Sequence, residues 1–208
     1  MYNSINFEAL KIASKKEVKP EIAGVLFTKD ATIATDSFRL IKISTPKNGN
    51  IEDFPSNITP LKDFQPFIIP AKALKDFKIA KTENTRTIPI LENAVITEIT
   101  PTTATLTSTD LDTVNKKEFY TIDGEYPDWE RIIPTAEPVA SFTIKGDYLA
   151  ELLAILAKLD PKKEVKVKFY GKDMPIRLDC GKFITCSNGF YFSIYTITFI
   201  DHNNTDGT

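Results

Sequence analysis

One stretch of this chain, Gly124-Glu125-Tyr126-Pro127-Asp128-Trp129-Glu130-Arg131-Ile132-Ile133-Pro134, contains the only tryptophan. Residues 117–122, which have the pattern of a β-strand, lead into it. Two prolines, which cannot donate hydrogen bonds to a sheet, frame its aromatic and arginine residues. The pattern indicates a fixed connector, which serves either as a packed domain junction or as part of a binding surface.

The composition of the whole chain is that of a soluble globular protein with one or two domains. Of its 208 residues, 42% are hydrophobic and 26% are charged, and the formal net charge is −2. No apolar run approaches the roughly 20 residues that a membrane helix needs, and the N-terminus lacks a signal-peptide pattern. We therefore expect a cytoplasmic protein that does not enter a membrane. Its only cysteines, Cys180 and Cys186, are expected to be reduced.

Motifs for catalysis and for cofactors are missing from the sequence. The only histidine, His202, lies in a polar tail at residues 201–208 that we expect to be disordered. The sequence contains no glycine-rich phosphate loop, nucleophile elbow or paired metal-ligand motif. It therefore predicts no enzyme, no cofactor and no metal.

Hydrophobic patterning predicts three units of similar order. The first has a helix at 4–16 and strands at 22–27, 31–35 and 39–44. The second has a strand at 67–69, a helix at 71–79 and strands at 88–91, 94–99, 104–108 and 117–122. The third has a strand at 140–144, a helix at 148–159 and strands at 164–170, 176–180, 183–187 and 191–199. We interpret all three as strand-helix-three-strand units, the first without a clear leading strand and the other two with one predicted strand more than this pattern. They favour an α+β fold with antiparallel sheets on one side and short helices on the other.

Two further motifs accompany the connector stretch. Residues 20–27 read Pro-Glu-Ile-Ala-Gly-Val-Leu-Phe, and residues 34–40 read Ala-Thr-Asp-Ser-Phe-Arg-Leu. With the order of the units, these motifs resemble the middle domain of the DNA polymerase III beta subunit family, the bacterial sliding clamps. The resemblance covers residues 5–134 well and 138–200 in outline. It implies a DNA-clamp-like fold with a complete domain at 1–134 and a half-domain at 138–200, as in a shortened relative.

The resemblance also implies a hydrophobic pocket for short peptides of partner proteins, DNA polymerase among them. The positions that match this pocket are Ile22, Thr35, Ser37, Phe38, Arg39, Leu40, Pro127, Arg131 and Ile132. An apolar floor and a cationic rim suit a peptide with aromatic or aliphatic anchors. The family has glycine where this chain has Ser37 and histidine where it has Phe38, so Phe38 either lines the pocket or fills it. The other interpretation of these residues is a satisfied domain junction.

Lysines recur on the exposed faces of the first two predicted helices. They are Lys11, Lys15, Lys72, Lys75, Lys78 and Lys81. The resemblance implies helices that line a hole for double-stranded DNA, where lysines contact phosphates without reading bases. A lysine row is also compatible with a merely solvated helix surface.

Length distinguishes this chain from the family that it resembles. The family has three complete domains of two units each, whereas three units in total are predicted here. Rings of this superfamily use twelve units, so four copies would supply the number if each half-domain were completed by a neighbour. The leading hypothesis is a non-enzymatic, sliding-clamp-like processivity factor for DNA polymerase or a reduced relative of one, with a homo-oligomeric ring as one candidate assembly. The alternative is a monomeric clamp mimic that binds clamp-binding peptides without encircling DNA.

Overall fold

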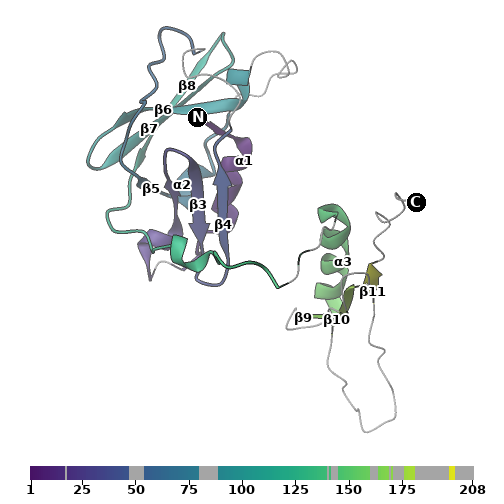
Figure 1. The fold of residues 1–208 in the computed structure, drawn as a ribbon. Coiled ribbons are helices and arrows are strands. Elements are labelled where there is room, and N and C mark those ends of the chain that lie inside the picture. The colour runs from purple at the N-terminus through teal and green to yellow at the C-terminus, as the bar shows by residue number, and fades with distance from the viewer. Residues whose placement is uncertain are drawn as a thin grey trace. The chain divides into compact units, whose positions relative to one another are not determined.

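A computed structural model describes residues 1–16, 18–46, 54–79, 89–139, 141, 145–159, 164–168, 170, 176–180 and 197–199. The chain divides into two compact units, Met1–Pro134 and Thr135–Thr208 (Figure 1). The strand expected at 183–187 and the tail at 201–208 lie outside the described residues, as does all of the strand expected at 140–144 except residue 141.

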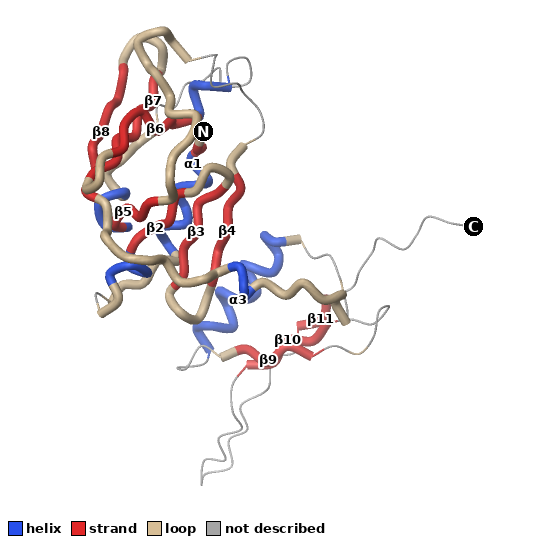
Figure 2. Tube along the Cα trace, turned by 60° about the vertical axis from the view of Figure 1, so that its left-hand side comes forward, coloured by secondary structure: helices blue, strands red, loops and turns tan. Residues whose placement is uncertain are grey.

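Two four-stranded antiparallel sheets form the first unit (Figures 1 and 2). One has the order β4-β3-β2-β5, with β2 at Gly24–Phe27, β3 at Ala31–Thr35, β4 at Leu40–Ser44 and β5 at Phe67–Pro70. The other has the order β1-β6-β7-β8, with β1 at Tyr2–Asn3, β6 at Asn93–Ile99, β7 at Thr103–Thr109 and β8 at Val114–Tyr120.

The two halves of this unit exchange their leading strands. β1, which precedes the first helix, pairs with β6 of the second half and places Tyr2 opposite Ala94. β5, which precedes the second helix, pairs with β2 of the first half and places Val25 opposite Ile69. Each leading strand therefore lies beside the first strand that follows the helix of the other half. β1 did not stand out in the sequence because it is only 2 residues long.

The helices of this unit are shorter than the predicted ones. Helix α1 spans Ser4–Phe7 and continues as the 3₁₀ helix η1 at Glu8–Lys11, while α2 spans only Ala71–Leu74. The first helix ends early because the chain turns: the Ser14 amide donates to the Ile22 carbonyl oxygen at 2.8 Å. That carbonyl belongs to the 3₁₀ helix η2 at Pro20–Ala23, which takes up the start of the strand predicted at 22–27.

The prediction of a strand at 88–91 is wrong for residues 89–91, the part of this range that the structure describes. Pro89–Glu92 forms the 3₁₀ helix η4. A proline suits the first position of a helical turn because it has no amide hydrogen to leave unpaired there. Leu91 is buried in a small cluster with Phe54, Ile58 and Val95, so its hydrophobicity reflects packing and not strand pairing.

Alternation along β2 gives its sheet two buried faces. Val25 and Phe27 point into the main core, which they share with Phe7 and Leu74 of α1 and α2. Leu26 points the other way, into a second cluster with Ile33, Ile68 and Trp129. The first of these faces is called the helix face below, and the second the connector face. A sheet covered on both faces explains why β2 reads as a continuous apolar run.

The second unit contains one helix and one described sheet. Helix α3 spans Gly146–Leu159, and the sheet has the order β11-β10-β9, with β9 at Val165–Lys168, β10 at Ile176–Cys180 and β11 at Ile197–Phe199. Leu156 of α3 is 0% exposed and packs with Leu178 of β10 in the core of this unit.

Candidate partner-binding surface

Residues 121–134, the connector, run across the connector face of the sheet β4-β3-β2-β5. The Ile122 amide donates to the Ile68 carbonyl oxygen at 2.8 Å, which attaches the connector to β5. Gly124 has a φ of 144°, a left-handed conformation that favours glycine. The chain then forms the 3₁₀ helix η5 at Glu130–Ile132. The fixed path predicted from the prolines is therefore confirmed.

Tyr126 and Trp129 hold the connector against the sheet. Both side chains are half-buried and pack on the cluster of Leu26, Ile33 and Ile68. The Tyr126 hydroxyl lies near the Thr35 main chain without a hydrogen bond of good geometry, and its burial raises its pKa to about 12. The Lys42 ammonium lies 4.7 Å from the centroid of the Trp129 ring, at cation–π distance. Trp129 therefore serves packing in this unit.

The turn between β3 and β4 is fixed by one carboxylate. Asp36 accepts hydrogen bonds from the main-chain amides of Phe38 at 3.0 Å and Arg39 at 2.8 Å. It also accepts from the Arg39 guanidinium, at 3.0 Å from Nε and 2.7 Å from Nη2. The Arg39 side chain and these amides lower the pKa of Asp36 to about 2. Ser37 takes a φ of 75° in this turn, which explains why glycine also suits the position.

Apolar side chains project from this turn and from η5. Phe38 is 93% exposed, and Ile132 and Ile133 are 61% and 41% exposed. Phe38 therefore fills no pocket in this structure. Arg131, also on η5, donates from Nε to Asp128 at 3.0 Å, so its guanidinium is already paired. The name exposed ridge is used below for the turn Asp36–Arg39 together with Arg131, Ile132 and Ile133.

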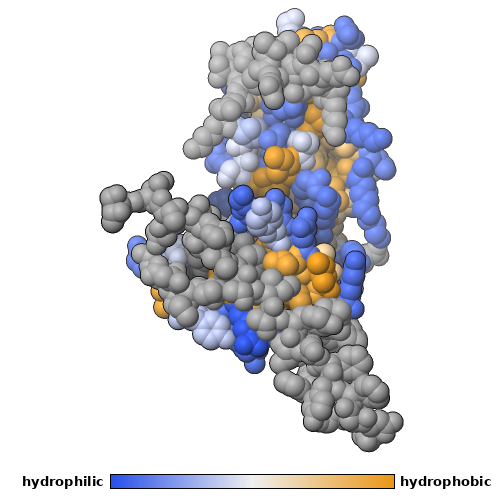
Figure 3. Space-filling view, turned by 90° about the vertical axis from the view of Figure 1, so that its right-hand side faces the viewer, coloured by the Kyte–Doolittle hydropathy of each residue, from blue (hydrophilic) through white to orange (hydrophobic). Residues whose placement is uncertain are grey.

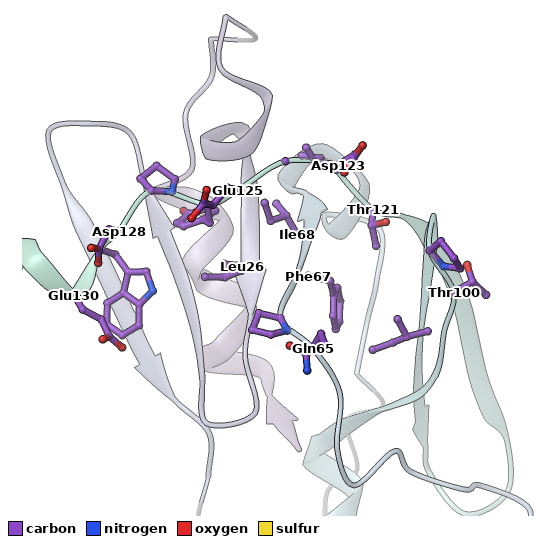
Figure 4. A pocket seen from close by; sticks show the side chains of 18 residues that line it. Leu26, Gln65, Phe67, Ile68, Thr100, Thr121, Asp123, Glu125, Asp128 and Glu130 are labelled. Atoms are coloured by element: carbon purple, nitrogen blue, oxygen red, sulfur yellow. The ribbon is translucent and has the colours of Figure 1, made fainter.

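A hollow of about 650 Å³ lies beside residues 121–130 of the connector (Figure 4). Its floor includes Leu26, Phe67 and Ile68, and the turn between β6 and β7 forms another part of its wall. The hollow is also lined by four acidic residues of the connector, which are Asp123, Glu125, Asp128 and Glu130. Such a lining combines an apolar floor with negative charge.

The structure separates the nine predicted pocket residues into groups. Pro127 alone among them lines the hollow. Ile22 and Thr35 are buried, and Leu40 packs with Trp129 in the cluster under the connector. The exposed ridge contains the others, which are Ser37, Phe38, Arg39, Arg131 and Ile132. The strand residues that floor the hollow were predicted only as parts of the strands at 22–27 and 67–69, because alternation in a strand does not say which face remains partly open.

Five of the six predicted DNA-contacting lysines lie on the helices and turns of the helix face. Lys11 and Lys15 are exposed after α1, and Lys11 forms an ion pair with Glu8. Lys72, Lys75 and Lys78 are exposed on α2 and the turn after it. Lys81 lies outside the described residues.

The described part of the chain contains neither a membrane-spanning helix nor a cluster of metal ligands. None of its helices has the length and apolar character needed to cross a membrane. In the same part of the chain, no three side chains of the kinds that ligate metals lie close enough together to hold a metal ion.

Similarity to known proteins is found in structure and not in sequence. No protein-family model and no curated protein sequence matches the chain. Solved structures do match. The DNA polymerase sliding clamp from Bacillus subtilis has 19% identity and a TM-score of 0.55, over 93% of this chain and 45% of the clamp. The sliding clamp from Pseudomonas aeruginosa has 14% identity and a TM-score of 0.56, over 95% of this chain and 50% of the clamp.

A third solved structure, a proposed DNA polymerase III beta subunit from Eubacterium rectale, has 15% identity and a TM-score of 0.51 over 94% of this chain and 50% of its own. The chain thus spans about half the length of the clamps that it matches. Identities this low establish the fold alone.

Proposed function

We propose that this chain, which has the fold of the bacterial sliding clamps over about half their length, acts as a non-enzymatic, clamp-like processivity factor. In this proposal the helix face binds DNA without sequence preference, and the exposed ridge binds short peptides of DNA polymerase and other partners. The observation that carries the proposal is the arrangement of the first unit. Its lysine-bearing helices lie on one face of the sheet β4-β3-β2-β5, and the connector lies on the opposite face with the ridge residues around it.

The chemistry of the exposed ridge supports the peptide-binding part. Phe38, which is 93% exposed at the turn, and Ile132 on η5 offer a partner two apolar side chains that can be buried on binding. Asp36 fixes the turn through four hydrogen bonds, so Phe38 starts from an ordered main chain and little conformational entropy is lost on binding. Arg39 and Arg131 already pair with Asp36 and Asp128, so an acidic group of the peptide would have to compete for them.

Fluorescence anisotropy tests the peptide-binding part. The probe is a labelled peptide with leucine and phenylalanine anchors and one acidic residue. We expect Arg131→Ala combined with Ile132→Ala to weaken its binding by about tenfold or more, because an apolar contact and a charge are removed together. Val114→Ala is the matched control, since Val114 is 47% exposed on β8 of the other sheet. Equal affinity of the double variant and the unaltered protein would mean that the ridge is only a junction.

Lysines on and after α2 support the DNA-binding part. Lys75 and Lys78 are exposed beside Leu74 and Phe77, which are buried in the main core, so their main chain is held in place. Each lysine that contacts a phosphate releases counterions from the DNA. The affinity for DNA therefore falls as the salt concentration rises, whatever the base sequence.

Binding to a short linear duplex at several salt concentrations tests the DNA-binding part. We expect Lys75→Glu with Lys78→Glu to reduce the affinity at low salt, and to reduce the slope of log K against log salt by about 2. The matched control is Lys29→Glu with Lys116→Glu, which makes the same change of charge at two exposed lysines, one in the turn between β2 and β3 and one on β8. If both pairs reduce affinity equally, only net charge matters and the helix face is not the DNA-binding surface. Peptide binding without any DNA binding would favour the clamp-mimic alternative.

A further inference from the structure

The hollow beside the connector takes no part in the proposed function. Its volume of about 650 Å³ is within the range of about 300–1,000 Å³ that is usual for ligand sites. The strands β2 and β5 form its floor through Leu26, Phe67 and Ile68, and Ile99 at the end of β6 adds to the apolar surface. Because β2 and β5 pair with each other along the sheet, this floor forms without any ligand.

The rim of the hollow carries negative charge that is mostly unbalanced. Asp123, Glu125, Asp128 and Glu130 line the hollow, and all four are exposed. Arg131 pairs with Asp128, but no lysine or arginine in the described part of the chain forms an ion pair with the other three. Figure 4 shows these acidic residues following one another along the connector. A ligand that meets them all therefore needs several positive charges along its length.

Apolar surface alone does not identify a binding site in this protein. Hydrophobic residues also appear among hydrophilic ones on the face of the molecule in Figure 3, as on most soluble proteins. The hollow differs because a concave shape, an apolar floor and charge of one sign occur together. Its floor can take apolar groups out of water, and its exposed rim can pair with cations that stay in water. Lysine and arginine side chains suit such a rim, because their methylene stems are apolar and their ends are charged.

We propose that the hollow binds a short segment of a partner protein in which leucine or phenylalanine is flanked by lysine or arginine. The apolar side chains lie on the floor, and the cationic side chains pair with the carboxylates of the rim. Charge complementarity identifies this occupant, because the same rim repels an acidic peptide or the phosphates of a nucleic acid. This site goes beyond the proposed function, in which the exposed ridge binds a peptide that carries an acidic residue.

Fluorescence anisotropy with the full chain at low salt tests this proposal. The probe is a labelled peptide with a leucine and a phenylalanine between pairs of lysines, and we expect saturable binding. Asp123→Asn with Glu125→Gln should weaken it about fivefold, because two exposed ion pairs are lost. The matched control is Asp112→Asn with Glu92→Gln, which makes the same changes at two exposed acidic residues that do not line the hollow. An equal loss in both variants would mean that only net charge matters, and would overturn the proposal.

A charge exchange and an altered probe test the rim and the floor separately. Asp123→Lys with Glu125→Lys should abolish binding of the cationic probe and allow binding of a probe with glutamates in place of its lysines. A probe with serines in place of leucine and phenylalanine should bind the unaltered protein about tenfold more weakly, because it leaves the floor uncovered. The emission of Trp129, which lines the hollow, reports that each variant is folded. No binding of the cationic probe, no exchange of preference, or equal binding of the serine probe would each overturn the proposal.

Phe38→Ala distinguishes this site from the exposed ridge. Phe38 belongs to the ridge and does not line the hollow, so this change should weaken binding of the acidic probe and leave the affinity for the cationic probe unchanged. A loss of cationic-probe binding in Phe38→Ala would place that probe on the ridge and overturn the proposal. Conversely, Asp123→Asn with Glu125→Gln should not weaken binding of the acidic probe. Either peptide site can therefore fail its test without the other.

Discussion

Gly24 begins β2 where residues of β5 and of the connector pack against it, and Gly24→Ala should destabilise the first unit. A Cβ atom at Gly24 would lie 2.4 Å from Ile68 Cγ2, 2.9 Å from Ile122 Cδ1 and 2.9 Å from the Ile69 carbonyl oxygen. The backbone itself tolerates alanine, because φ is −108° and ψ is 173°. The whole cost is therefore steric.

The size of this cost follows from what the methyl group meets. Side chains can rotate away, but the Ile69 carbonyl belongs to the ladder between β2 and β5 and can move only if that pairing loosens. Overpacking of this kind costs about 1–3 kcal/mol. For a unit of this size it corresponds to a fall in Tm on the order of 5–10 °C.

Thermal unfolding followed by tryptophan fluorescence measures this effect, because the only tryptophan, Trp129, packs on the connector face of the same unit. Gly146→Ala is the control: a Cβ there meets nothing within 4 Å, at the first residue of α3. It should leave the Trp129 transition unchanged and stabilise α3 by about 0.4–1 kcal/mol. A Gly24→Ala protein that unfolds within about 1 °C of the unaltered one would refute this account of the connector face.

Three further substitutions test the core, the turn and the connector. Leu74→Ala, at a side chain 1% exposed in α2, should cost about 2–5 kcal/mol in urea unfolding even though alanine is the better helix former. Asp36 has a folded pKa of about 2 against an ordinary value of 3.8, so its contribution to stability is present above pH 3.8 and is lost as the pH falls toward 2. Asp36→Asn should therefore remove the part of the loss of stability between pH 3.8 and pH 2 that is due to Asp36. The measurement is the difference between the acid-unfolding curves of the variant and the unaltered protein. Lys42→Ala should cost about 0.5–1 kcal/mol and shift Trp129 emission, because it removes the cation over the indole; unchanged emission would count against that contact.

The candidate site was predictable where it depends on residues close in sequence. The turn Asp36–Arg39 is closed by hydrogen bonds that span three residues or fewer, and its carboxylate and guanidinium are visible in the sequence. The stretch 124–134 likewise shows its fixed course through its prolines. By contrast, the hollow beside the connector brings together β2, β5, the turn between β6 and β7, and the connector itself. No local sequence pattern encodes the arrangement of these four segments, because the arrangement depends on which strands pair with one another.

By itself the sequence determined most of the order of elements, the connector and the positions of the lysines, since periodicity and prolines act over a few neighbouring residues. Only the tertiary structure decided that the halves of the first unit exchange leading strands. A strand as short as Tyr2–Asn3 carries almost no pattern of its own, and it becomes a strand only because the edge of β6 satisfies its main chain and the core buries Tyr2. The structure also decided that Phe38 projects outward while Leu40, two residues later, packs beneath the connector. Which of these two side chains is buried depends on where the connector crosses the sheet. The connector takes that position only when it and the sheet fold together.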